Sequence, residues 1–216
     1  MSSRIVVFGA GGRAGRRAVA EAVARGHQVT AVVRDVAAYK GPTGDHVSVV
    51  AGDVTRAESV AEAAAGHDAA INAAGRMDVP SRDFYVSATR ALLDGLARAG
   101  VGRLVLIGIG SVLETAPGVA VHDAPGFPEE ARAFSLGHAA ELDVLRAAET
   151  EIDWLVIAPP PVMLDDEAPR TGRYRTGGGE VMADGAPSFS YADLAVALID
   201  EIETPKNRRS ITAVAG

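Results

Sequence analysis

A glycine-rich turn near the start of the chain has the spacing of a phosphate-binding loop. Gly9, Gly12 and Gly15 follow one another at intervals of three residues, directly after an apolar run at residues 5–8. Gly9 permits a sharp exit from a strand, Gly12 lets a pyrophosphate approach the backbone, and Gly15 lets a helix pack close to the sheet. The free N–H groups and positive dipole end of that helix would face the phosphates. We therefore predict dinucleotide binding at Gly9, Gly11, Gly12, Arg13, Ala14 and Gly15.

The residue that decides between NAD and NADP is expected about 20 residues after these glycines. An NAD-binding fold has Asp or Glu there to bind the ribose 2′-hydroxyl, whereas this chain has Arg34. A guanidinium suits a 2′-phosphate in charge and in fork geometry, and Arg13 could contact the other side of that group. The alternative is that Arg34 is a solvated strand end beside Asp35. We expect NADPH to be preferred over NADH.

Small residues and an arginine follow another predicted strand, which ends at Asn72. Ala74 and Gly75 would let the chain pass beneath the ribose and diphosphate of a cofactor, because ligands of such folds bind at the carboxyl edge of the sheet. Arg76 is a candidate for a phosphate contact, with an ordinary exposed charge as the alternative.

Apolar runs that alternate with helical patterns predict the elements that hold these residues in place. Residues 4–34 form a strand, a helix and a second strand, which is a βαβ unit. The alternation continues, so we predict an α/β fold: a Rossmann-type, doubly wound parallel sheet in a three-layer α/β/α arrangement, built by one domain over residues 1–216. The helix over residues 80–99 carries Phe84 and Tyr85 on an apolar face that is expected to pack in the core. The predicted strands cover residues 5–8, 28–33, 46–50, 68–72, 103–107, 153–158 and 210–214, and further helices cover about 55–65 and 190–203.

Composition and charge exclude several classes of function. Of 216 residues, 48% are hydrophobic and 23% charged, as in an ordinary globular domain. The formal net charge of −7 argues against a nucleic-acid partner. The chain has no cysteine, and its five histidines form no HxxxH or HExxH pair, so disulfides, thiolate catalysis and a metal site are not expected. No apolar run reaches the roughly 18 residues of a membrane span, and a strand begins too early for a signal peptide, so we expect a cytoplasmic protein without a membrane partner.

The second half of the chain narrows the interpretation to a family. The GxxGxxG spacing resembles that of extended and atypical short-chain dehydrogenases/reductases. The segments IGIGSVLETAPG, GFPEEA, HAAELDVLRA, IDWLVIAPP, RTGRY, SYADLAVALIDEIE and RRSITAVA resemble the bacterial NAD(P)H-binding proteins described as NADH-flavin reductases. These are atypical short-chain reductases similar to biliverdin IXβ reductase and to the NmrA-like group, and the resemblance covers about residues 4–214.

The resemblance implies roles for several further strand ends. It places Asp53, followed by Val54, at the adenine amino group, with a helix N-cap as an alternative or additional role for Asp53. It places Ser111 beside the nicotinamide as a catalytic serine, with a turn serine as the alternative. A backbone carbonyl of Pro159 or Pro160 would contact the carboxamide, because proline has no N–H to donate. The loops at about 112–130 and 160–190 would form the substrate side, and the segments Arg170 to Tyr174 and Gly177 to Gly179 would form a small hairpin or flap there.

The tyrosine and lysine of the classical short-chain reductases are missing. Phe134 and His138 stand at the two positions of the YxxxK pair, and no other YxxxK pair exists, because the only lysines are Lys40 and Lys206. Tyrosine-driven carbonyl chemistry and sugar epimerisation are therefore not expected. In the family that this chain resembles, a histidine at position 138 is usual. We predict that His138 binds the nicotinamide ribose or relays a proton, with an ordinary polar helix residue as the alternative.

The function that the resemblance implies is a direct hydride transfer from NAD(P)H to a planar conjugated acceptor, such as FMN or another flavin, with Ser111 and His138 as the catalytic candidates. Two alternatives stay open. One is a quinone reductase, and the other is a regulatory protein of NmrA type that senses NAD(P)H without turnover. The expected partner is the small-molecule acceptor alone, and the chain is expected to be a monomer or a homodimer.

Overall fold

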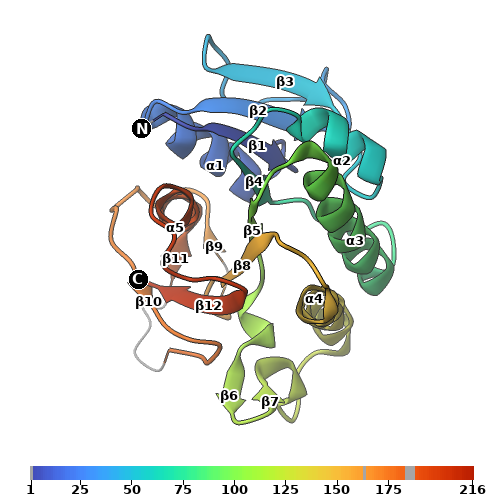
Figure 1. Cartoon of the computed structure of the whole chain (residues 1–216). Helices are drawn as coiled ribbons and strands as arrows, with labels where there is room; N and C mark the ends of the chain where they lie inside the picture. Colours follow the sequence, from blue (N-terminus) through green and yellow to red (C-terminus); the bar gives the residue numbers. More distant parts are fainter. Residues whose placement is uncertain (1, 163, 183–187) are drawn as a thin grey trace.

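The computed structural model describes residues 2–162, 164–182 and 188–216. Its main sheet has eight strands in the order β10-β12-β8-β5-β4-β1-β2-β3, and all neighbours are parallel except β10 and β12 (Figure 1). The predicted α/β fold is confirmed, and the predicted strands agree with the observed ones to within one residue at each end. The strands are β1 Arg4–Phe8, β2 Gln28–Val33, β3 Val47–Ala51, β4 Ala69–Asn72, β5 Arg103–Ile107, β8 Asp153–Ala158, β10 Arg175–Thr176 and β12 Ser210–Ala215.

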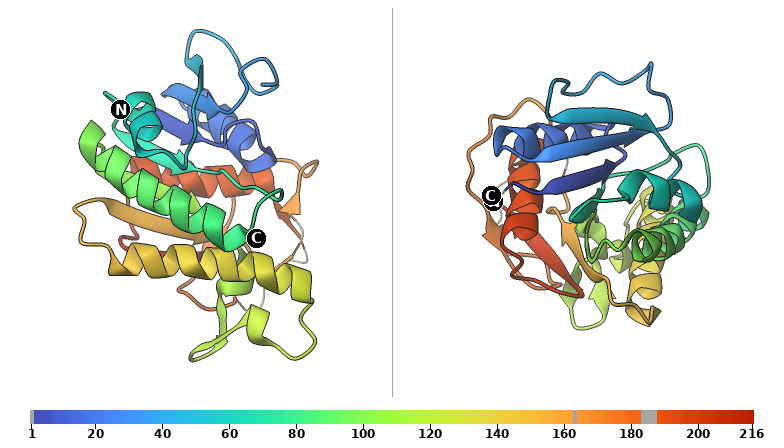
Figure 2. Two further views of the ribbon diagram at one scale, coloured as in Figure 1. Left: turned by 90° about the vertical axis from the view of Figure 1, so that its right-hand side faces the viewer. Right: turned by 45° about the horizontal axis from the view of Figure 1, so that its top comes forward.

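Helices cover both faces of the sheet. The helices α1 (Arg13–Ala24) and α5 (Tyr191–Glu203) lie on one face, and α2 (Ala57–Ala64), α3 (Ser81–Ala99) and α4 (Glu129–Ala147) lie on the other (Figure 1). Figure 2 shows α3 and α4 side by side along the second face. No helix in the described ranges combines the length and the apolar character needed to cross a bilayer.

Alternating side chains of the strands build a separate core under each helical layer. In β1, Ile5 and Val7 belong to the core beneath α1 and α5, whereas Val6 and Phe8 belong to the core beneath α2, α3 and α4. All four side chains are buried, because a strand in the middle of a parallel sheet is covered on both faces. Phe84 and Tyr85 of α3 are buried in the second core, as predicted.

The strand order reverses between β1 and β4. From β1 the chain builds outward through β2 and β3, and then returns to place β4 on the other side of β1. In open α/β sheets the crevice beyond the carboxyl ends of the strands at such a reversal is the usual ligand site. The glycine turn after β1 and the Ala74-Gly75 turn after β4 both open into this crevice.

The segment at 112–130 contains more structure than a loop. A short 3₁₀ turn, η1 (Gly110–Val112), leads into a hairpin of β6 (Glu114–Ala116) and β7 (Val119–Ala120), and a second such turn, η2 (Val121–Asp123), follows. The backbone N–H of Gly118 donates to the Glu114 carboxylate over 3.0 Å across the hairpin turn. The hairpin extends away from the main sheet (Figure 1).

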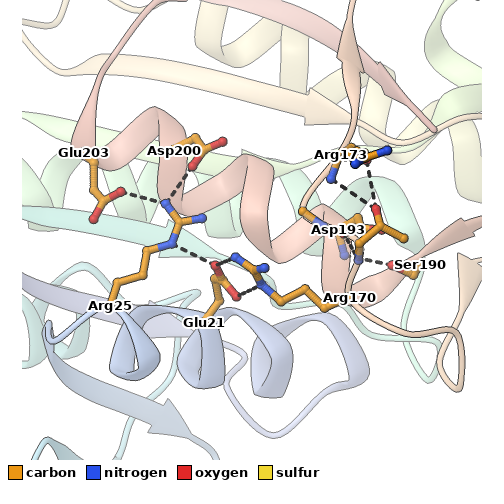
Figure 3. A network of polar contacts seen from close by, with 10 residues as sticks. Glu21, Arg25, Arg170, Arg173, Ser190, Asp193, Asp200 and Glu203 are labelled. Atoms are coloured by element: carbon orange, nitrogen blue, oxygen red, sulfur yellow. Dashed lines mark hydrogen bonds and ion pairs between the residues drawn. The ribbon is translucent and has the colours of Figure 1, made fainter.

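The prediction of a small hairpin of residues 170–174 and 177–179 is wrong, and the alternative, a flap, stays a prediction. The strand Arg175–Thr176 instead pairs with the chain's last strand, and β9 (Leu164–Asp165) pairs with β11 (Phe189–Ser190). The reason lies in the side chains, which tie this segment to α1 and α5 (Figure 3). Arg170 bonds Glu21 of α1 over 2.7 and 2.8 Å, and the N–H groups of Thr171 and Gly172 donate to Asp193 of α5. Residues 163 and 183–187 of the expected substrate loop lie outside the described residues.

Candidate cofactor-binding site

A cavity of about 410 Å³ lies at the carboxyl ends of β1, β2, β3 and β4. It brings together residues that the sequence had predicted from four separate strand ends. Of the predicted cofactor residues, those that line it are Gly9, Gly11, Gly12, Arg34, Asp53, Val54, Ala74, Gly75 and Arg76. The sequence-based interpretation did not include Tyr39 and Phe84, which also line it.

Two of the turn glycines are required by the fold itself. Gly9 has a φ of +74°, and a Cβ there would lie 2.5 Å from the Cα of Ala74. A Cβ on Gly15 would lie 2.2 Å from the carbonyl oxygen of Gly9, so the helix could not pack so closely on the turn. Both contacts are far inside van der Waals distance, and a larger residue at either position would force the backbone apart.

Gly11 and Gly12 have space around them. A Cβ on Gly12 would meet nothing closer than the Gly9 carbonyl oxygen at 3.5 Å, and a Cβ on Gly11 nothing closer than Val33 at 3.5 Å. The fold therefore does not need glycine at these two positions. The space that the missing side chains leave faces the cavity, where a phosphate group could approach the backbone.

The N-terminus of α1 is open toward an anion. Gly12 is the N-cap with an extended backbone, no described side chain accepts from the helix's first N–H groups, and the first turn has no acidic residue. The N–H groups of the first turn, which include those of Arg13 and Ala14, have no partner within the helix. Together with the space above Gly12, this gives the donor set and the room that a diphosphate requires.

Arg34 is exposed at the end of β2 and lines the cavity. It forms no ion pair or hydrogen bond with the described residues, so its guanidinium is free to bind a phosphate. The structure does not bring Arg13 to the same place. Its guanidinium lies over the ring of Tyr191, 5.5 Å from the centroid, on the side of α5.

Arg16, one helical turn further on, does not line the cavity, but its charge acts on Tyr39, which does. Burial raises the pKa of Tyr39, and the charge of Arg16 partly offsets that rise. The guanidinium of Arg16 forms an ion pair with Asp166, with 3.7 Å between Nη2 and Oδ2. The Nε of Arg16 is buried and finds no hydrogen-bond partner in the described part of the chain. No motif marks this residue in the sequence, since its direction is set by the packing of α1.

Asp53 presents an ionised carboxylate at the rim of the cavity. Its Oδ1 accepts from the N–H and the hydroxyl of Thr55, over 2.9 and 2.7 Å. Partial burial works to raise the pKa of Asp53, but these two bonds and the nearby Arg56 and Arg76 outweigh it and hold the pKa below its ordinary value. The residue is not the N-cap of α2, which is Arg56. An ionised acceptor here suits an amino group such as that of adenine.

Arg76 also lines the cavity, but it is already paired. Its Nε lies 2.9 Å from Oδ1 of Asp78, and its Nη2 contacts Oδ2 of the same carboxylate. This bidentate pair lowers the pKa of Asp78 to about 2. A phosphate at Arg76 would have to compete with Asp78 for a bidentate pair. Arg34 acts on Asp78 only through its charge, and it has no hydrogen bond or ion pair with the described residues to give up.

Ser111 lies outside the cavity, at the end of β5, and its hydroxyl hydrogen is already used. Its Oγ lies 2.7 Å from Oγ of Ser135, and Ser135 donates its own hydrogen to the carbonyl of Ala131 over 2.8 Å. Because a hydroxyl has one hydrogen, Ser111 must donate to Ser135 when both bonds form. Ser111 then offers a ligand only its lone pairs.

Pro159 lies against the turn that carries Ser111. A Cβ on Gly110 would lie 2.5 Å from the carbonyl oxygen of Pro159, so the ends of β5 and β8 touch here. The carbonyl of Pro160 accepts from the N–H of Val162 over 2.7 Å. Pro159 and Pro160 are the two predicted carboxamide contacts. The carbonyl of Pro160 already accepts a hydrogen bond, so that of Pro159 is the better candidate.

His138 is buried between α3 and α4, and it does not line the cavity. Its Nδ1 donates to Glu141 over 3.1 Å, so the Nε2 carries the lone pair when the ring is neutral. The imidazole packs on the ring of Tyr85 with a centroid distance of 3.8 Å, and it packs edge to face with Phe134 at a centroid distance of 5.2 Å. The histidine and the phenylalanine that replace the classical dyad thus belong to one aromatic cluster.

Comparison with known proteins finds one matching family model and several similar solved structures. A family model described as NAD(P)H-binding matches residues 9–205. A candidate exported protein from Burkholderia pseudomallei is 36% identical, with a TM-score of 0.86 over 99% of this chain and 100% of the other. A candidate epimerase from Bacteroides thetaiotaomicron is 32% identical, with a TM-score of 0.87 over 100% and 97%. A candidate NADH-flavin reductase from Streptococcus pneumoniae is 27% identical, with a TM-score of 0.86 over 99% of both chains.

Proposed function

The chain belongs to the NAD(P)H-binding family, and from this premise we propose that it is an NAD(P)H-dependent reductase that transfers hydride to a flavin or a similar planar conjugated acceptor. The observation that carries the proposal is the cavity between the glycine turn, Arg34 and Asp53, whose donors, acceptor and open space suit a dinucleotide. The name of the streptococcal relative supports a flavin as the acceptor.

Residues at three strand ends bind three different parts of the cofactor. The first N–H groups of α1, above Gly12, bind the diphosphate. The carboxylate of Asp53 accepts from the adenine amino group. Arg34 binds a 2′-phosphate, because its guanidinium has no hydrogen-bonded or ion-paired partner in the described part of the chain, and this favours NADPH over NADH.

NAD(P)H, when bound, supplies the hydride. The protein's own task is then to position two rings beside the ends of β5 and β8. Ser111 accepts a hydrogen bond from an N–H of the carboxamide or of the acceptor, since its own hydrogen goes to Ser135. The carbonyl of Pro159 is the neighbouring acceptor, and His138 supports the ribose side.

The absence of a tyrosine and lysine pair at Phe134 and His138 limits the acceptor. A simple ketone needs a proton from a positioned general acid as hydride arrives, and the classical dyad supplies it. A flavin is strongly oxidising and has less need of such an acid. The same sequence feature therefore supports a conjugated acceptor.

The test is the loss of NADPH absorbance when the purified chain is mixed with FMN, riboflavin or a quinone in separate reactions. We expect turnover with the flavins, and we expect NADPH to serve better than NADH. Turnover with quinones alone would identify a quinone reductase. Tight NADPH binding without turnover on any of these acceptors would contradict the reductase proposal and support an NAD(P)H-sensing regulatory role.

A further inference from the structure

The hydroxyl of Tyr85 has no bonding partner among the described residues, although the rest of the side chain is held firmly. The residue is only 4% exposed, and its ring is packed against Phe84, Phe134 and His138 at centroid distances of 5.2, 5.9 and 3.8 Å. The hydroxyl makes no hydrogen bond to the described residues, yet it is not among the fully buried polar atoms that lack a partner. Tyr85 itself does not line the cavity, so its hydroxyl can meet a ligand only at the turn that carries Gly75.

That hydroxyl lies at the turn that follows β4. It is 3.2 Å from the point where a Cβ on Gly75 would stand, and Gly75 lines the cavity. The strand β4 lies between β1, whose turn is suited to the diphosphate, and β5, whose end carries Ser111. A bound dinucleotide would have its adenosine half at Arg34 and its nicotinamide at Ser111. The ribose of the nicotinamide half must then lie at the end of β4.

The surroundings of Tyr85 keep the phenol protonated and fixed. Burial, together with the carboxylate of Glu141, raises the pKa of Tyr85 far above its ordinary value. The group is thus a hydrogen-bond donor and not a source of protons for the reaction. Thr89 donates to the carbonyl of Tyr85 over 2.7 Å, and Glu141 holds the imidazole of His138 against the ring.

We propose that Tyr85 is a cofactor-binding residue, whose phenol donates a hydrogen bond to a hydroxyl of the nicotinamide-side ribose of NAD(P)H. His138 and Glu141 act as positioning residues that hold the Tyr85 ring at this ribose. The inference rests on the proposed placement of the cofactor across the strand ends, and it assigns a binding function to a residue of the apolar face of α3.

The test compares Tyr85→Phe with the unchanged protein in titrations with two ligands. NADPH contains the ribose in question, whereas adenosine 2′,5′-bisphosphate contains only the adenosine half. We expect the Kd for NADPH to rise about threefold to tenfold, the usual effect of one lost hydrogen bond, while the Kd for the bisphosphate changes less than about twofold. The Tm should stay the same, because the hydroxyl has no bond within the described protein.

Tyr174→Phe is the matched control. Its hydroxyl donates to Asp200 over 2.6 Å on the opposite helical layer, so its removal should lower the Tm and leave both dissociation constants unchanged. An unchanged Kd for NADPH in Tyr85→Phe, or an equal loss of affinity for both ligands, would overturn the inference. If the reductase proposal is wrong, the result is different: the unchanged protein binds both ligands normally but does not reduce any of the acceptors.

Discussion

Gly9 and Ala74 are in backbone contact, because a Cβ on Gly9 would lie 2.5 Å from both the nitrogen and the Cα of Ala74. This contact locks the turn after β1 against the turn after β4, at the point where the strand order reverses. The two turns then face one ligand together. The glycines of the first turn are therefore of two kinds. The fold needs glycine at Gly9 and Gly15, and it does not need glycine at Gly11 and Gly12.

The first prediction separates these two kinds of glycine. Gly9→Ala should lower the free energy of unfolding by about 2–4 kcal/mol, since the new methyl group meets backbone and the φ is positive. Gly12→Ala should change it by less than about 1 kcal/mol, because its φ is −74° and the nearest atom is 3.5 Å away, but it should raise the Kd for NADPH about tenfold or more. Urea unfolding and ligand titration measure the two effects. Normal NADPH binding by Gly12→Ala would show that the diphosphate lies elsewhere.

The second prediction concerns cofactor choice. Arg34→Glu should weaken NADPH binding about tenfold to a hundredfold, through loss of a charge-assisted bond and gain of repulsion, and NADH binding by less than about threefold. Arg98→Glu is the matched control, because Arg98 is exposed on α3, pairs with Asp94 one helical turn earlier and does not line the cavity. Equal losses of affinity for both cofactors in Arg34→Glu would contradict recognition of a 2′-phosphate.

The sequence predicts the sheet and the glycine turn well because local patterns determine them. Short β-branched runs between helical patterns specify buried parallel strands, and each strand end in such a sheet points to the same edge. Arg34, Asp53 and Gly75 can therefore be assigned to one site from the order of the strands and the residues that follow them. The observed cavity contains all three.

What the sequence could not show depends on side-chain direction and on distant contacts. The motif points to Arg13, but the packing of α1 places its guanidinium over the ring of Tyr191. Arg16, which no motif marks, forms an ion pair with Asp166. Tyr85 fits the apolar face of its helix, and no pattern reveals that its hydroxyl stays free at Gly75. The segment around Arg170 has turn residues in its sequence, yet ion pairs with α1 decide its course.

The third prediction is a pH dependence of stability at the junction of α1 and the segment around Arg170 (Figure 3). The hydrogen bonds from Arg170 and then Arg25 hold the pKa of Glu21 below its ordinary value of 4.5, against the opposing effect of burial. A carboxyl whose pKa is lowered by folding stabilises the protein above that ordinary value, and the stabilisation is lost as the pH falls through the folded pKa. The free energy of unfolding should therefore decrease below about pH 4.5.

Glu21→Gln tests this origin. Its free energy of unfolding at neutral pH should be about 1–3 kcal/mol lower, because two arginines lose a largely buried partner, and its decline below pH 4.5 should be shallower than in the unchanged protein. Glu58→Gln serves as the control, since its ion pair with Arg56 is exposed and should contribute less than about 0.5 kcal/mol. Identical acid profiles for the unchanged protein and Glu21→Gln would assign the pH dependence to other carboxylates.

The last prediction concerns the chain of hydroxyls from Ser111 through Ser135 to the Ala131 carbonyl. If Ser111 orients a ring by its lone pairs, Ser111→Ala should lower kcat/KM for flavin reduction about tenfold. Ser135→Ala should lower it about threefold, because Ser111 then loses the acceptor that fixes its hydrogen. The double variant should match Ser111→Ala alone, since Ser135 acts only through Ser111. Steady-state kinetics with saturating NADPH measure all three variants. Additive losses would give Ser135 a separate role, and an unchanged rate and KM in Ser111→Ala would remove Ser111 from the reaction.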